Sequence, residues 1–233
     1  MLRDLLPHTS ETPSGVPDEE TYTRYREASK ALVEKVMEAS MDRNAIDRAG
    51  RELGIMSPEG VLMFDSEEDM TVLMDYTLHE CRYKGKNAFE RYHEQVDGDS
   101  GAGCAAIDDL EREILAARVA SSTSLFSTAS VSPETNSLQL EDLVQEGRII
   151  TLVDINLSHS LTQPVILFLR SITFEAGWSA SSGVSFSYPL KLERELLRVW
   201  RVRGRGLREH ASARRFAALF RLSKTKGYET LYR

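Results

Sequence analysis

The pattern of apolar and polar positions changes twice along the chain. From residue 18 to residue 121 apolar residues return every three or four positions, as on one face of a helix. From residue 123 to residue 188 they alternate within short runs rich in Ser, Thr, Val and Phe, which is typical of strands. Beyond Pro189 the helical spacing returns. The sequence therefore predicts an α+β fold with helices on either side of one central sheet.

Helix boundaries follow from capping signals. Ser66 with Asp69 and Asn87 with Glu90 are typical of helix starts, and Gly54 is a usual residue just beyond a helix end. The expected helical N-terminal part and the basic C-terminal helices span residues 18–39, 44–53, 66–81, 87–96, 105–121, 189–203 and 207–222.

The central region predicts five short strands joined by tight turns. Such strands favour a small antiparallel five-stranded sheet or a partly open barrel, with residues 154–160 as a loop. The expected strands span residues 123–131, 137–140, 148–155, 164–174 and 178–188.

Composition also predicts a division into parts. Residues 1–17 contain three prolines and a glycine among polar residues, which indicates a flexible arm. A helical region follows at 18–96, and the run DGDSGAG at 97–103 is typical of a linker. Residues 104–233 then hold a helix, the sheet or barrel, and the C-terminal helices.

Overall composition favours a cytoplasmic protein that does not contact a membrane. Of the 233 residues, 41% are hydrophobic and 28% charged, which is ordinary for a globular protein. Two cysteines are too few for a disulfide scaffold. Apolar runs fall well short of the roughly 20 residues of a membrane span. The N-terminal residues lack the long apolar core of a signal peptide.

A net charge of −7 hides two regions of opposite sign. Residues 191–233 contain 13 Lys and Arg against 4 Asp and Glu, whereas residues 1–190 contain 16 against 32. A basic tail on an acidic body indicates an anionic partner for the tail, or attraction between body and tail.

Arginine in the tail is the strongest candidate for a binding function. Guanidinium groups bind carboxylates and phosphates with two parallel hydrogen bonds. The partner is an unidentified protein or other anionic ligand. Nucleic acid, RNA more than DNA, is the alternative, with Trp200 or Tyr228 to stack on bases. The candidate residues are Arg198, Arg201, Arg203, Arg205, Arg208, Arg214 and Arg215.

No motif predicts a metal site or a cofactor. Asp97, Asp99 and Asp108 have part of the spacing of a calcium loop, but that loop's central glycine is replaced by Ala102. His79 and Glu80 begin a zinc motif that Tyr83 interrupts.

Catalytic signals are equally sparse. Asp154, Ser158 and His159 are the residue types of a nucleophilic triad, so a hydrolase using the segment from Asp154 to His159 is a second alternative. A working triad assembles in space, however, and the sequence assigns no catalytic residue. The aromatic residues of the strands are expected to fill the core of the sheet. These are Phe168, Phe174, Trp178, Phe186 and Tyr188.

About half of the chain resembles a family of uncharacterised bacterial proteins, some of which carry a zinc motif of the SEC-C type. The resemblance lies in Met74-Asp75-Tyr76, ASSTSLF at 120–126, Leu140-Glu141-Asp142-Leu143, Val153-Asp154, Leu157-Ser158 and the apolar strand ending near Arg170. It implies a similar architecture and no established activity. This chain lacks the cysteines and histidine of the zinc motif.

Overall fold

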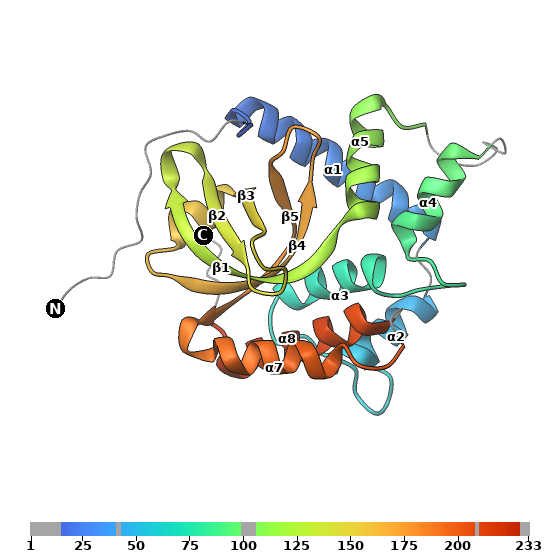
Figure 1. Cartoon of the computed structure of the whole chain (residues 1–233). Helices are drawn as coiled ribbons and strands as arrows, with labels where there is room; N and C mark the ends of the chain where they lie inside the picture. The colour runs from blue at the N-terminus through green and yellow to red at the C-terminus, as the bar shows by residue number, and fades with distance from the viewer. Residues whose placement is uncertain (1–14, 41–42, 99–105, 208–209, 229–233) are drawn as a thin grey trace. The chain divides into compact units, whose positions relative to one another are not determined.

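The computed structural model describes residues 15–40, 43–98, 106–207 and 210–228. Its elements confirm the α+β class (Figure 1). The helices are α1 (Glu19–Ser40), α2 (Arg43–Leu53), α3 (Glu68–His79), α4 (Ala88–Asp97), α5 (Asp109–Ala120), α6 (Ile155–Ser160), α7 (Glu193–Arg203) and α8 (Ala211–Lys226), with short 3-10 turns η1 (Pro133–Thr135) and η2 (Leu190–Leu192).

Within the described residues, five strands form one sheet that closes on itself in the order β1-β2-β3-β5-β4. The strands are β1 (Ser122–Ser132), β2 (Ser137–Asp142), β3 (Ile149–Val153), β4 (Val165–Thr173) and β5 (Ser179–Pro189).

Closure of the sheet corrects two details of the predicted antiparallel or partly open arrangement. The ring is closed, and β3 pairs with β5 in the parallel sense through Leu152 and Ser179. Strand β1 joins the two halves of the ring, because it pairs with β2 along one side and with β4 along the other. A shift of register between Thr128 and Ser130 marks an irregularity in its pairing with β2. Because β5 follows β4 around the ring, it meets β3.

Aliphatic side chains fill the inside of this ring. Leu167 and Leu169 of β4 belong to the inner cluster together with Phe126 of β1. Since neighbouring residues on a strand point to opposite faces, Phe168 lies on the outer face, stacked on Phe186 at 5.6 Å between ring centroids. The aromatic residues are therefore buried as predicted, but Phe168 and Phe186 lie outside the ring rather than in its core.

The chain forms two compact units. Among the described residues, the first unit contains 15–22, 121–202 and 222–228, including the closed sheet, and the second contains 23–120 and 203–221. Most of the expected linker at 97–103 and of the expected flexible arm at 1–17 lies outside the described residues. Helix α5 belongs with the helices of the second unit and not with the sheet. Lys35 of α1 holds α5 there through an ion pair of 2.6 Å with Glu111.

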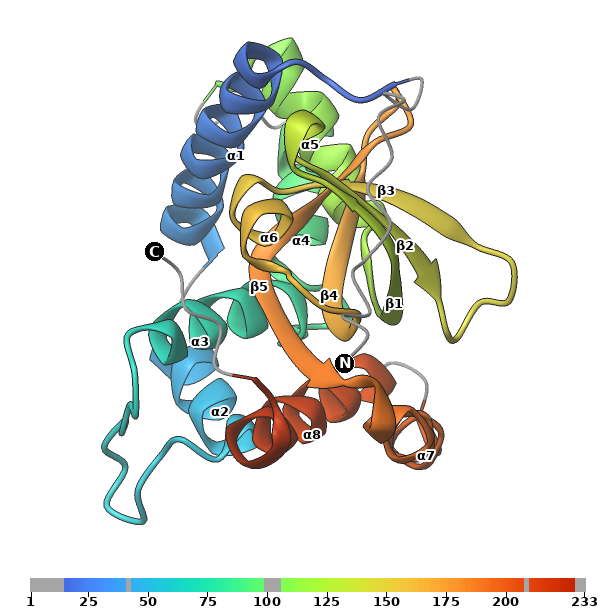
Figure 2. The ribbon, with the colours of Figure 1, turned by 90° about the vertical axis from the view of Figure 1, so that its left-hand side faces the viewer.

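In the first unit, α6 follows β3 where a loop was expected, and it lies against β2 and η1. Figure 2 shows β5 running directly through η2 into α7. The position of α7 is thus fixed by the sheet from which it continues.

The second unit has its own core. Tyr76 of α3 contacts Phe216 of α8 edge-on and donates a 2.6 Å hydrogen bond to the Glu52 carboxylate. Burial, with a further contribution from Glu52, raises the pKa of the Tyr76 phenol. His79 stacks on Phe89 at 4.5 Å between ring centroids, so this buried histidine is part of the packing.

Candidate binding surface on helix α7

Helix α7 begins where its sequence favours a start. Glu193 and Glu195 lie in the first turn, where negative charge interacts well with the helix dipole. Leu196 and Trp200 are buried, and the Trp200 ring contacts Phe168 of β4 at 6.4 Å between centroids. One side of α7 is therefore packed against the outer face of the sheet.

The exposed side of α7 carries a row of three arginines. Arg194, Arg198 and Arg201 are spaced by four and three residues, so they lie on one face of the helix, and all three are exposed. A rise of about 1.5 Å per residue spreads their Cα atoms over about 10 Å along the axis. We call these three residues the arginine row.

No ion pair involves the arginine row within the described part of the chain. Arg201 donates from Nε to the carbonyl oxygen of Leu197 within its own helix, at 3.2 Å. The nearby acidic side chain Glu195 is neutralised separately by Lys226, at 2.7 Å. The row therefore presents positive charge to solvent.

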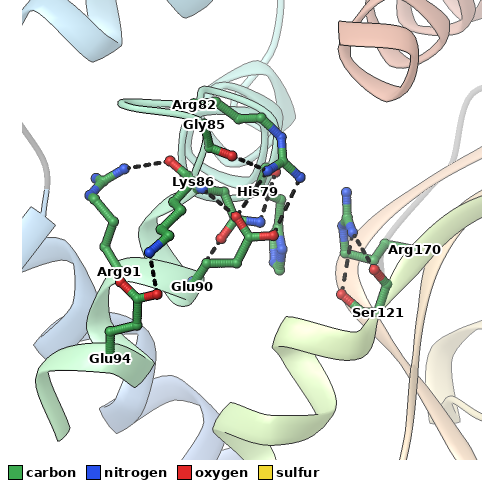
Figure 3. Close-up of polar contacts among 10 residues, drawn as sticks. His79, Arg82, Gly85, Lys86, Glu90, Arg91, Glu94, Ser121 and Arg170 are labelled. Atoms are coloured by element: carbon green, nitrogen blue, oxygen red, sulfur yellow. Dashed lines mark hydrogen bonds and ion pairs between the residues drawn. The ribbon is translucent and has the colours of Figure 1, made fainter. Parts of the chain in front are cut away.

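Other basic residues of this protein form hydrogen bonds and ion pairs within the fold. In the second unit, Arg82 donates to the Gly85 carbonyl oxygen and forms an ion pair with Glu90 at 3.0 Å, and Lys86 forms one with Glu94 (Figure 3). In the first unit, Arg170 donates to the carbonyl oxygen of Ser121 at 3.1 Å. These cations serve the fold, unlike those of the arginine row.

The remaining predicted arginines divide into two kinds. Arg203 and Arg205 are exposed at the end of α7 and in the turn after it. Arg208 lies outside the described residues. Arg214 and Arg215 on α8 are only partly exposed.

Arg214 and Arg215 stabilise the turn that follows α7. The Arg214 guanidinium donates to the carbonyl oxygens of Arg203, Arg205 and Leu207 at 2.7–3.1 Å. Desolvation, assisted by the charge of Arg214, lowers the pKa of Arg215. Arg214 therefore has contacts that account for it without a partner, and Arg215 lies close over Gly204 in the same turn.

Comparison with protein-family models gives one match, a family of unknown function, DUF7986, over residues 17–233. The chain belongs to this family. No curated protein and no solved structure matches the chain. The family description assigns no activity and makes no link to SEC-C-motif proteins, so the earlier resemblance stays a prediction.

The predicted binding residues do not include two members of this surface. Arg194 completes the row, and Val202, which is 49% exposed, adds an apolar side chain beside Arg198. The helical spacing of residues 194, 198 and 201 could have identified Arg194. The densest basic cluster, by contrast, begins only at Arg201.

The candidate stacking residues differ in exposure. Trp200 is 7% exposed and packed on the sheet, so the expectation that it could stack on a nucleic-acid base is wrong. Tyr228 is 42% exposed, and its amide group bonds to the carbonyl oxygen of Ser187.

The triad residue types near β3 are separately engaged. Asp154 caps α6 by accepting from the Leu157 amide at 3.0 Å. Ser158 donates to the Ile155 carbonyl oxygen, and His159 lies 3.1 Å from the Asn136 amide oxygen. Ser158 and His159 thus bond to groups outside the triad.

The residues that the structure describes contain no group of three or more His, Cys, Asp or Glu side chains able to hold a metal ion. Nor do they include a helix long and apolar enough to cross a membrane.

Proposed function

We propose that this protein is a non-enzymatic binding protein that docks through the arginine row of α7 onto an acidic surface of a protein partner. The observation that carries the proposal is the exposure of three guanidinium groups on one fixed helix face, without an ion pair among the described residues.

A protein surface suits the chemistry of this helix face. Arginine forms bidentate hydrogen bonds with carboxylates and is weakly hydrated, so it is favoured in interfaces. Val202 lies beside Arg198 and supplies apolar contact area that a purely electrostatic ligand would not use. Helix α7 would thus contact its partner along one face through charge and a small apolar surface.

Two features favour a protein over nucleic acid. Trp200 is buried and does not offer a stacking surface. In addition, the order of the closed sheet, with a helix between its third and fourth strands, corresponds to OB-fold barrels, which bind oligonucleotides on the face of β2 and β3. Neither of these strands contains Lys or Arg in this chain.

The test compares binding to fluorescent poly-L-glutamate with binding to single-stranded RNA and double-stranded DNA at low and physiological salt. The variant Arg194→Glu/Arg198→Glu/Arg201→Glu should bind poly-L-glutamate at least about tenfold more weakly, because charge reversal creates repulsion. The control Arg24→Glu/Lys30→Glu/Arg43→Glu makes the same change in net charge at exposed positions elsewhere.

Two outcomes would overturn the proposal. One is the absence of any poly-L-glutamate binding at low salt, or equal losses in the variant and its control. The other is tighter binding of RNA or DNA than of poly-L-glutamate, lost with the arginine row, which would assign nucleic acid as the partner.

A further inference from the structure

The segment between α2 and α3 is an ordered hairpin. The Ser57 amide donates to the Val61 carbonyl oxygen and the Met63 amide to that of Ile55, both at 2.8 Å. Gly60, with φ of 82°, makes the turn in a backbone conformation that suits glycine. Residues 55–64 are called the α2–α3 hairpin, and both views show this segment extending beyond α2 and α3 (Figures 1 and 2).

One face of the hairpin anchors it to its unit. Leu62 packs so closely on α2 that a Cβ atom at Gly50 would lie 2.5 Å from its Cδ2 atom. Side chains alternate along a strand, so Val61 and Met63 point the other way, and they are 60% and 62% exposed. Phe64 follows at 37%. An ordered backbone thus holds three large apolar side chains in solvent.

Clustered exposed apolar residues of this kind mark contact surfaces more often than isolated ones do. Methionine adds adaptability to such a surface because its side chain is flexible and polarisable. Met70, 48% exposed in the first turn of α3, extends the apolar character of the segment.

Along the sequence, the charged residues of the hairpin and of the turns beside it all have one sign. No Lys or Arg occurs between Arg51 and Arg82. A hydrogen bond from Ser57 lowers the pKa of the Glu59 carboxyl. The exposed acidic residues are Glu59, Asp65, Glu67 and Glu68.

This surface is complementary to α7 of the same sequence. The hairpin combines apolar side chains with carboxylates, and α7 combines Val202 with the arginine row. Opposite charges steer association and fix register, while apolar contacts supply affinity. A second copy of the chain therefore offers the acidic surface that the proposed function requires.

We propose that the α2–α3 hairpin of one copy binds the exposed face of α7 of a second copy, which rests on the proposed function and names its partner. The two surfaces differ, so the contact is head-to-tail, and a bound pair still offers one free hairpin on one copy and one free α7 on the other. Association should grow with protein concentration and weaken with salt.

Sedimentation velocity over a concentration series at low salt tests this. Arg198→Glu/Arg201→Glu reverses the α7 surface, and Glu59→Arg/Glu67→Arg reverses the hairpin. Each variant alone should associate at least tenfold more weakly than wild type. Met63→Ser should weaken association with the charges intact. Arg24→Glu/Arg43→Glu is the charge-matched control for the α7 variant, and circular dichroism checks that each variant is folded.

Mixing the two charge variants gives the sharpest result. The α7 variant then carries two acidic surfaces and the hairpin variant two basic ones, so each variant associates weakly alone, whereas their mixture should associate about as strongly as wild type, with the two variants alternating. A chain with all four substitutions should associate again, because both surfaces have exchanged sign.

A wild-type chain that stays monomeric at low salt overturns the proposal, and so does a mixture that forms no complex. Association that neither charge variant weakens places the contact elsewhere and also overturns it. If self-association fails while poly-L-glutamate still binds through the arginine row, the proposed function stands and its partner is a different acidic protein. If both fail, neither proposal holds.

Discussion

The guanidinium group of Arg215 lies directly over the backbone of Gly204, where an added Cβ atom would come within 2.1 Å of Nη2. Gly204→Ala should therefore displace this guanidinium and lower the free energy of unfolding by about 1 kcal/mol. Urea denaturation measures the change.

A double-mutant cycle isolates that contact. In an Arg215→Ala background the clash is absent, so Gly204→Ala should be close to neutral or slightly stabilising. Equal losses in the two backgrounds would show that Arg215 does not restrict residue 204.

The start of α4 provides a second prediction. Asn87 accepts from the Glu90 amide while Glu90 accepts from the Asn87 amide, a complete capping box. Asn87→Ala should cost about 1 kcal/mol of unfolding free energy. Ser66→Ala before α3 is the control and should stay within about 0.5 kcal/mol, because α3 has no side-chain cap. A larger loss from Ser66→Ala would contradict the structure.

Asp142 provides a third prediction. It is 2% exposed and accepts hydrogen bonds from the Ser124 hydroxyl at 2.7 Å, from two amides of the turn after β2, and from Arg148. Asp142→Asn removes the charge that pairs with Arg148 and should cost about 2–3 kcal/mol in chemical denaturation. The exposed neighbour change Glu141→Gln should be nearly neutral. Similar small effects at both positions would mean that the buried network adds little.

Cys81 gives a prediction about pH. Burial raises the pKa of its thiol from the ordinary 9.0 to about 11. Below pH 9 the thiol is neutral in both states, and its contribution to stability is complete. Between pH 9 and pH 11 the unfolded chain loses the proton while the folded chain keeps it, so the free energy of unfolding falls by about 1.4 kcal/mol per pH unit.

Cys81→Ala lacks this titration and serves as the reference. In urea denaturation with reductant, the stability advantage of wild type over the variant should shrink by about 2–3 kcal/mol from pH 8 to pH 11. A constant difference across this range would show that the folded thiol titrates normally.

Local patterns predicted local structure well. The spacing of Asn87 and Glu90 identified a real cap, whereas Ser66 and Asp69 have the same spacing and do not form one. The difference is that the Asp69 carboxylate accepts from the Asp65 amide instead. Helix α6 was expected as a loop because six residues show no periodicity, although Asp154 at its start was a usable signal.

Contacts between distant segments were beyond the sequence pattern. No pattern within β3 or β5 predicts that they pair, because the contact joins Leu152 and Ser179, which lie far apart in the sequence. For the same reason, the sequence did not separate Arg198 and Arg201 from Arg214 and Arg215. Their different roles depend on which carbonyl groups lie within reach of α8.

The parallel contact between β3 and β5 has a consequence for motion. This contact consists of one residue pair, Leu152 and Ser179, whereas β4 pairs with β5 from Val165 to Thr173. Few main-chain bonds must break for the ring to part at this joint, so amide hydrogens there should exchange with solvent before those between β4 and β5. The sheet that fixes the position of α7 would therefore open first on the side of β5 away from β4.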